Sequence, residues 1–121
     1  MAIKFANNAS ATLASGITNT QTSLSVSTGQ GALFPALLAG EYFYATLVDP
    51  SNNIEVVKVT ARSGDAFTIV RGQDSTTART YASGDKIEVR LSAAGLAAIQ
   101  QEAVDGATNA TNNALAFAIA L

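Results

Sequence analysis

The chain has 121 residues, about one domain in length, and only 13% of them are charged, against about 25% in a typical globular domain. Its net charge of −2 leaves no basic surface large enough to collect phosphates, so no nucleic-acid partner is expected. Cysteine and histidine are both absent from the sequence, which excludes disulfides, thiolate or imidazole metal sites, and catalysis by a cysteine nucleophile or a histidine base. We therefore predict no cofactor, no metal and no enzymatic activity.

The ends of the sequence show no membrane or secretion signal. The single positive charge near the N-terminus, Lys4, is not followed by the apolar run of a signal peptide. The longest strongly apolar run, residues 114–121, is far shorter than the ~20 residues of a membrane span. Residues 5–40 and 106–121 carry no charge, which predicts surfaces covered by a partner or, for the first stretch, a neutral polar surface.

In the first part of the chain, apolar and polar residues alternate with the two-residue period of half-buried strands. The alternation covers residues 11–17 and 23–27, with a hairpin connection expected at residues 17–22. Residues 32–38, which include Pro35, predict a compact loop or one helical turn.

The next strands are separated by clusters of turn-forming residues. Residues 41–48 are aromatic and β-branched, and a polar turn at residues 49–53 leads into a strand at 54–62. Strands at residues 67–71 and 86–91 complete the set. This spacing predicts a mainly β fold over residues 1–91, a small antiparallel β-sandwich or barrel followed by a C-terminal α-helical segment. The predicted core contains Leu13, Ile17, Leu24, Val26, Phe43 or its neighbours, Val57, Val59, Phe67, Ile69, Ile87, Val89 and Leu91.

The character of the sequence changes at Ser92, which can cap a helix. Small and apolar residues then follow a weak heptad, and Gly106 is expected to break or bend the helix. Because residues 92–121 hold only two charged residues, we expect this segment to pack against other copies of the chain, with packing on its own β domain as the alternative. The expected oligomer-interface residues are Leu96, Ile99, Ala103, Leu115, Phe117, Ile119 and Leu121.

Three polar patterns could carry chemistry, and each has a simpler structural explanation. Residues 49–55 partly match a calcium loop, but a hairpin turn explains the same residues and the loop's required glycine and final glutamate are missing. The spacing of the acidic residues at turns does not favour a glycosidase pair. A sugar-stacking surface is also conceivable, although alternate aromatic residues in strands are more often core or interface. The acidic residues are Asp65, Asp74, Asp85 and Glu88, and the stacking candidates are Tyr42, Tyr44 and Tyr81.

The densest polar segment is residues 71–79. Its two arginines, Arg71 and Arg79, can form forked hydrogen bonds to a carboxylate, either Asp74 or Asp85. We predict a structural clamp or docking contact in this loop. A ligand-binding loop that includes Tyr81 is the alternative.

The same region contains a series of short motifs. They are residues 34–35 (FP), 41–43 (EYF), 46–49 (TLVD), 55–65 (EVVKVTARSGD), 70–74 (VRGQD), 77–79 (TAR) and 82–85 (ASGD). Together they resemble a domain near the N-termini of tail-fibre and of neck- or baseplate-associated proteins of tailed bacteriophages. The resemblance covers about residues 5–98. The strand, turn and Arg-Gly-Gln-Asp loop are its most specific part, and none of the motifs is a catalytic signature.

The resemblance implies a non-catalytic attachment domain, residues 1–91, that docks a fibre or appendage onto the virion, followed by an oligomerisation segment, residues 92–121. Since phage fibres are commonly trimeric, it implies a homotrimer that contacts other virion proteins of the tail, neck, portal or fibre. The protein would be assembled in the host cytoplasm and located in the virion. Fibre proteins usually continue into a long shaft, whereas this sequence ends at Leu121, which favours a short adaptor or a fibre base. The alternatives are a carbohydrate- or receptor-binding β module of a fibre and a capsid decoration protein.

Overall fold

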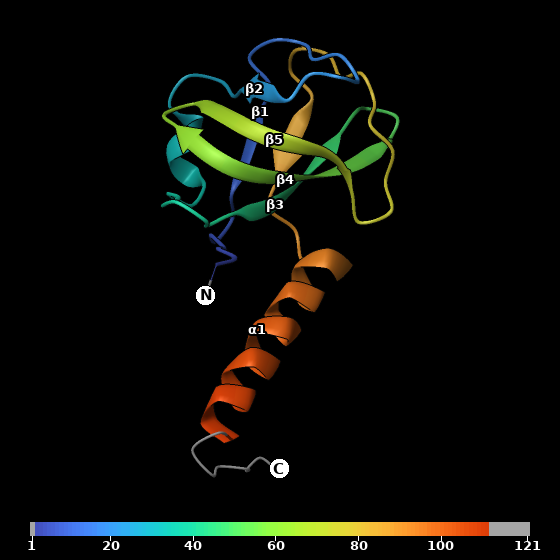
Figure 1. Cartoon of the computed structure of the whole chain (residues 1–121). Coiled ribbons are helices and arrows are strands. Elements are labelled where there is room, and N and C mark those ends of the chain that lie inside the picture. Colours follow the sequence, from blue (N-terminus) through green and yellow to red (C-terminus); the bar gives the residue numbers. More distant parts are fainter. Residues whose placement is uncertain (1, 112–121) are drawn as a thin grey trace.

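The computed structural model describes residues 2–111, with side chains of the C-terminal helix described through Val104. Within these residues, six strands form one antiparallel sheet that curls into a half-barrel, and a single α-helix follows it (Figure 1). The predicted fold class, mainly β with a C-terminal helix, is confirmed. The elements are β1 (Ser10–Thr12), β2 (Ser23–Ser25), the 3₁₀ helix η1 (Gln30–Leu33), β3 (Phe43–Val48), β4 (Ile54–Ser63), β5 (Ala66–Gln73), β6 (Lys86–Glu88) and α1 (Ala93–Thr111).

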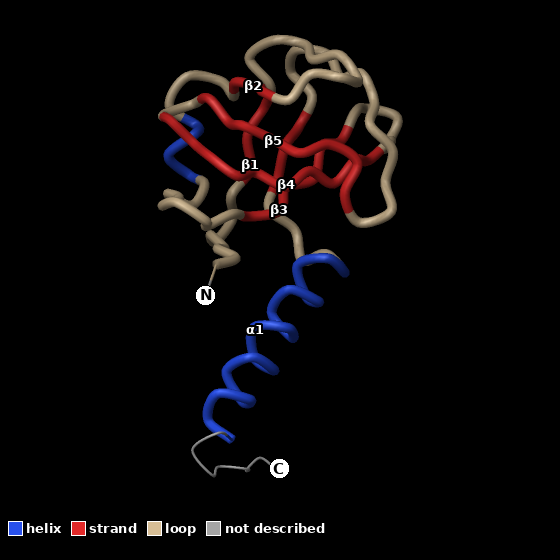
Figure 2. Tube along the Cα trace, in the orientation of Figure 1, coloured by secondary structure: helices blue, strands red, loops and turns tan. Residues whose placement is uncertain are grey.

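The strands lie in the order β1-β6-β3-β4-β5-β2, and the sheet curls until its two outer strands meet (Figure 2). Leu13, which follows β1, forms an antiparallel bridge with Val26, which follows β2. Two hydrogen bonds of 2.9 Å flank the bridge, from Ala14 N to the Ser25 carbonyl and from Ser27 N to the Thr12 carbonyl. The long β4–β5 hairpin has two register shifts, and such irregularities increase the bend of a strand pair.

The first two strands agree with their prediction only in part. We expected residues 11–17 and 23–27 to pair as a hairpin, and the two segments do meet antiparallel at the Leu13–Val26 bridge. Their strand ladders form elsewhere, however, because β1 pairs with β6 and β2 pairs with β5. The strand predicted at residues 11–17 is interrupted, because Ile17 forms a separate bridge with Tyr81. Local alternation identified the buried side of each segment, but the partner strand is set by contacts distant in sequence.

A carboxylate ties η1 to the turn of the β4–β5 hairpin. The Asp65 carboxylate accepts hydrogen bonds from the backbone N–H groups of Gly29 (3.1 Å) and Gly31 (2.9 Å). These bonds lower the pKa of Asp65 below its ordinary value. Gly31 packs directly on the turn, and a β-carbon there would lie 2.2 Å from the Gly64 carbonyl oxygen. Only glycine fits this position without a shift of the backbone.

The core lies inside the curled sheet, around the packed rings of Phe34, Phe43 and Phe67. Of the predicted core residues, Val89 is only half-buried. The prediction of Leu91 as a core residue is wrong, since Leu91 is 73% exposed. The reason is that β6 ends at Glu88, where its pairing with β1 and β3 ends, so the following residues leave the sheet. The predicted core residues that are buried are Leu13, Ile17, Leu24, Val26, Phe43, Val57, Val59, Phe67, Ile69 and Ile87.

Helix α1 leaves the β domain beside the N-terminal segment and projects away from it (Figure 1). Ser92 caps it as predicted, because its Oγ accepts a hydrogen bond of 3.0 Å from Gly95 N. The predicted break at Gly106 is wrong, since the helix continues through this residue to Thr111. The sheet therefore carries a rod-like extension at one end.

Candidate functional site

The loop that follows β5, residues 73–81, contains the residues for which the sequence predicted a clamp or a ligand contact. It starts at a register shift of the β4–β5 pair, where Arg71 and Gly72 lie opposite the single residue Val57. Gly72 adopts a left-handed φ of 61° there. This bulge turns the chain away from the sheet and places the Arg71 side chain next to Glu55, near the start of β4.

The clamp is a buried ion pair between Arg71 and Glu55. Arg71 Nε donates to Glu55 Oε2 and Arg71 Nη2 donates to Glu55 Oε1, each at 2.8 Å. The Glu55 side chain is fully buried, and that of Arg71 is 9% exposed. The forked hydrogen bonds predicted for Arg71 thus exist, but the prediction of Asp74 or Asp85 as the acceptor is wrong. Sequence reasoning missed Glu55, although one signal was present: it is the only acidic residue within the apolar run of residues 54–59.

Both members of the pair make further hydrogen bonds that hold the loop. The Glu55 carboxylate also accepts from the backbone N–H groups of Gly72 and Arg79, each at 2.9 Å. Burial alone raises the pKa of Glu55, but the bonds from Arg71 and from the two backbone groups outweigh burial and lower it below its ordinary value. Arg71 Nη1 donates to the carbonyls of Thr18 (2.6 Å) and Gln21 (2.9 Å), and Nη2 donates to the Arg79 carbonyl. One charged pair therefore joins three separate segments of backbone.

Asp74 connects the loop to the helix. It has a left-handed backbone, with φ of 53°, and its Oδ1 accepts a 3.0 Å hydrogen bond from Ala94 N. Ala94 lies in the first turn of α1, where backbone N–H groups have no partner inside the helix. Asp74 and Ser92 thus share the capping of α1, and the loop sets where the helix begins.

The other two residues predicted for this loop lie in different environments. The Arg79 side chain is exposed, and its role in the clamp comes from its backbone groups. Its charge helps to lower the pKa of Asp49, after the larger effect of the hydrogen bonds that Asp49 accepts. Tyr81 is only 2% exposed, and burial raises its pKa to about 12. Its hydroxyl has no hydrogen-bond partner among the described residues. Tyr81 is therefore part of the core and not of a contact surface.

The three tyrosines do not form one stacking surface. Tyr42 and Tyr44 pack edge to face with centroids 5.6 Å apart, near the helix, and Lys58 Nζ lies 4.3 Å from the Tyr42 ring centroid. Burial raises the pKa of Tyr42, with smaller contributions from the neighbouring Tyr44 and Glu102. Tyr81 instead pairs with Ile17 through backbone hydrogen bonds in both directions.

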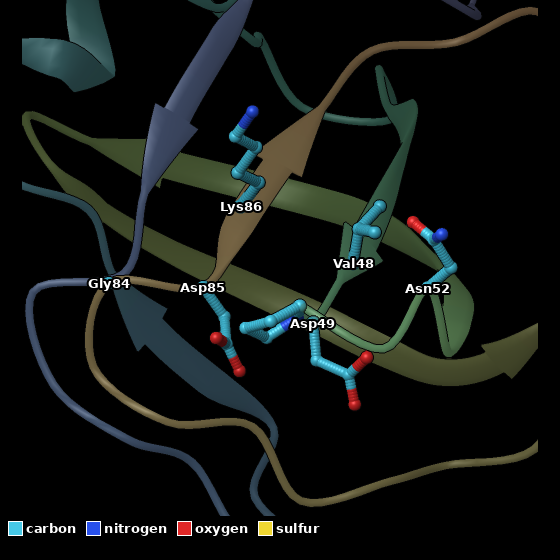
Figure 3. Close-up of a pocket in the computed structure, with 7 residues that line it drawn as sticks. Val48, Asp49, Asn52, Gly84, Asp85 and Lys86 are labelled. Atoms are coloured by element: carbon cyan, nitrogen blue, oxygen red, sulfur yellow. The ribbon is translucent and has the colours of Figure 1, made fainter.

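An open pocket of about 330 Å³ lies between the β3–β4 turn and the start of β6, and its lining includes Asp49, Asn52, Asp85 and Lys86 (Figure 3). The carboxylates of Asp49 and Asp85 point in a similar direction, while Lys86 points away from them (Figure 3). Asp49 accepts hydrogen bonds from the backbone N–H groups of Ser51 and Asn53 and from the Asn53 side chain. These are the bonds of a polar turn. Among the described residues, no group of three or more acidic side chains gathers in a way that would hold a metal ion.

The predicted oligomer-interface residues divide into two groups. Leu96 and Ala103 are exposed on α1, whereas Ile99, which neighbours both on the helix surface, is half-buried. The remaining four, Leu115, Phe117, Ile119 and Leu121, lie outside the described residues.

Comparison of the chain with family models and with curated proteins finds no match in either set. Between residues 2 and 111, no helix combines the length and the apolar character required to cross a membrane.

Proposed function

We propose that this chain is a non-catalytic structural component of a tailed-phage particle, a fibre or tail/neck adaptor that docks an appendage onto the virion. The observation that carries the proposal is helix α1, which the β domain holds outward with Leu96 and Val104 exposed at 46% and 57%. Exposed apolar residues on a projecting helix favour a role in assembly. The motifs within residues 34–85 resemble tailed-phage virion proteins, and this resemblance is the reason for proposing a phage particle as the assembly.

The use of polar groups in the Arg-Gly-Gln-Asp segment supports a structural role for it. Arg71 directs its donors to Glu55 and to backbone carbonyls of the same chain. Asp74 accepts from the helix. These bonds favour a structural role, in which Arg71 and Glu55 hold the loop and Asp74 links the loop to the helix. The exposed Arg79 side chain is the member of the loop best placed for a docking contact with another virion protein.

The surface predicted for the carbohydrate- or receptor-binding alternative combines three tyrosines, Tyr42, Tyr44 and Tyr81, with the loop of residues 71–79. The burial of Tyr81 speaks against this surface, because the three tyrosines do not lie together. A capsid decoration protein remains a second possibility, which differs from an adaptor in where the protein lies on the particle.

The location of the chain on virions tests the proposal. In a lysate that produces tailed particles from the genome encoding this chain, the chain carries a small affinity tag and the purified particles are labelled with gold. We expect label at the neck, tail or fibre base in wild-type particles. Label over the head surface would favour the decoration protein, and particles without the chain would contradict both. Glycan cleavage by the purified protein, lost in Asp74→Ala, would overturn the non-catalytic assignment.

A further inference from the structure

Helix α1 has an inner face that the β domain occupies. Gly95 is buried, and a β-carbon there would lie 3.6 Å from the Ile3 side chain and 3.7 Å from Tyr44. Two turns later, Glu102 Oε1 accepts a 2.7 Å hydrogen bond from Ala2 N. Ile99 lies four residues after Gly95 and three before Glu102, so it shares this face, and it is half-buried. The inner face therefore packs within one chain.

Over residues 93–104, the opposite, outer face of α1 is exposed and carries no charged side chain. Over residues 93–104 the one charged residue is Glu102, which lies on the inner face. Leu96 and Val104 are the large apolar residues exposed on α1, and Gln100 lies between them along the helix. Over residues 93–104 the outer face consists of Ala93, Ala97, Gln100, Gln101 and Val104, with Leu96 and Ala103 at its border with the inner face.

The spacing of the outer face matches a coiled-coil seam. Ala93, Ala97, Gln100 and Val104 are separated by four, three and four residues, which is the spacing of a and d positions in a heptad repeat. Leu96 and Ala103 flank this row on one side, seven residues apart. Small residues at such positions allow helices to approach closely, and one polar residue among them can set register and the number of helices.

We infer that the outer face of α1, centred on Gln100, is the seam along which copies of this chain pack in parallel and in register. The inference rests on the proposed function and deepens it, because it replaces the predicted interface around Leu96, Ile99 and Ala103 with one that excludes Ile99. A charge-free face can meet an identical face without like-charge repulsion, which makes a second copy the fitting occupant.

Two features of the chain favour copies arranged in parallel. In a parallel seam Gln100 faces Gln100, and each amide offers both donors and acceptors to the other. An antiparallel seam pairs the two amides only where the helices cross at Gln100, and every other antiparallel register would place each amide against apolar residues. The helix also carries the chain away from its own β domain through Thr111 (Figure 1), and the sequence that follows, residues 112–121, contains no charged residue.

Cysteine cross-linking of the full chain tests the assignment, because the sequence contains no cysteine and single substitutions have no background. Under mild oxidation we expect Gln100→Cys to form disulfide-linked dimers within the assembly. The matched control, Ile99→Cys, is the adjacent residue on the inner face and should stay predominantly unlinked. Equal cross-linking of both variants, or preferential linking of Ile99→Cys, would overturn the inference.

A pair of valine substitutions tests the same face without disulfide chemistry. Val104→Glu introduces a charge on the outer face, whereas Val70→Glu makes the same change on β5 at a residue that is 44% exposed. We expect Val104→Glu to weaken self-association by more than about tenfold in sedimentation, and Val70→Glu to leave it unchanged. Circular dichroism checks that both variants fold. A wild-type chain that stays monomeric at all concentrations would overturn the seam while leaving the virion location, measured separately by gold labelling, intact.

Discussion

In the β domain, carboxylates hold the loops in place, and each accepts several hydrogen bonds from its own chain. Glu55 accepts four, from Arg71 and from two backbone N–H groups, and Asp65 accepts two from backbone N–H groups near η1. On helix α1 the situation is reversed: Leu96 and Val104 remain exposed. Apart from the Tyr81 hydroxyl, the buried side-chain polar groups of the described β domain have hydrogen-bond partners, and the sheet encloses a core. Both regions expose some large apolar side chains, but those of α1 lie on a helix that contacts the sheet along one face only.

This difference means that contacts of the two regions should respond to mutation in different ways. Removing a contact inside the β domain should lower its free energy of unfolding whether or not copies associate. Removing a contact at the start of the helix should change the helix locally and leave the sheet intact. The following variants test this comparison, from the largest expected effect to the smallest.

The largest effect is expected at the buried ion pair. Glu55→Gln removes the negative charge and leaves the Arg71 guanidinium buried without a counter-charge, so we expect a loss of about 3–5 kcal/mol in the free energy of unfolding, measured by urea denaturation. Glu88→Gln is the matched control, because Glu88 pairs with Arg90 at the same 2.8 Å distance but at an exposed site. That control should lose less than about 1 kcal/mol. Similar losses in both variants would show that Glu55 does not organise the domain.

The burial of individual strand residues shows how far the sequence predicts the β domain. Alternation correctly identified the inward side of residues such as Leu24, Val59 and Ile87, because burial of one face produces a local pattern. The pattern failed at Leu91, where a strand ends for lack of a partner and not for lack of apolar residues. Strand length depends on pairing between distant segments, and a single sequence does not display that pairing.

The candidate site was only partly predictable for a similar reason. Arg71 was recognisable as a residue that forms forked bonds, but its partner lies on the preceding strand, 16 residues earlier, and acidic residues closer in sequence seemed equally suitable. Ile99 fitted the heptad as well as Gln100 does. Which side of the helix faces the sheet is decided by contacts with Ala2, Ile3 and Tyr44, and helical periodicity alone cannot distinguish the sides.

A smaller effect is expected at the junction of loop and helix. Asp74→Ala removes the acceptor for Ala94 N and places alanine at a left-handed φ, so we expect a loss of about 1 kcal/mol, with faster hydrogen exchange at the first turn of α1. Exchange in β3–β5 should change little. Asp74→Asn keeps an acceptor and tolerates this backbone conformation, so it should retain most of the protection. Uniform loss of protection across the sheet in Asp74→Ala would contradict a local role.

The smallest effect concerns Tyr81 and appears at alkaline pH. Because its folded-state pKa is raised to about 12 from an ordinary value of 10.0, the stabilising contribution of the neutral phenol is fully present below pH 10 and is lost as the pH rises toward 12. Tyr81→Phe removes a hydroxyl that has no partner among the described residues, so its stability at pH 7 should be equal to or slightly above that of the wild type. Thermal unfolding at pH 7 and pH 11 should show a smaller alkaline loss in the variant. An equal loss in both proteins would assign the alkaline sensitivity to other groups.

The bridge between the two outer strands, at Leu13 and Val26, affects how the edge of the sheet can interact with other molecules. A sheet with open edges offers unpaired N–H and C=O groups to which a strand of another molecule can add, and this is a common route to aggregation. Here the hydrogen bonds of Ala14 and Ser27 use backbone groups at the point where the edges would otherwise be free. At this position the two edge segments already use each other's backbone groups, so a strand of another molecule cannot add there.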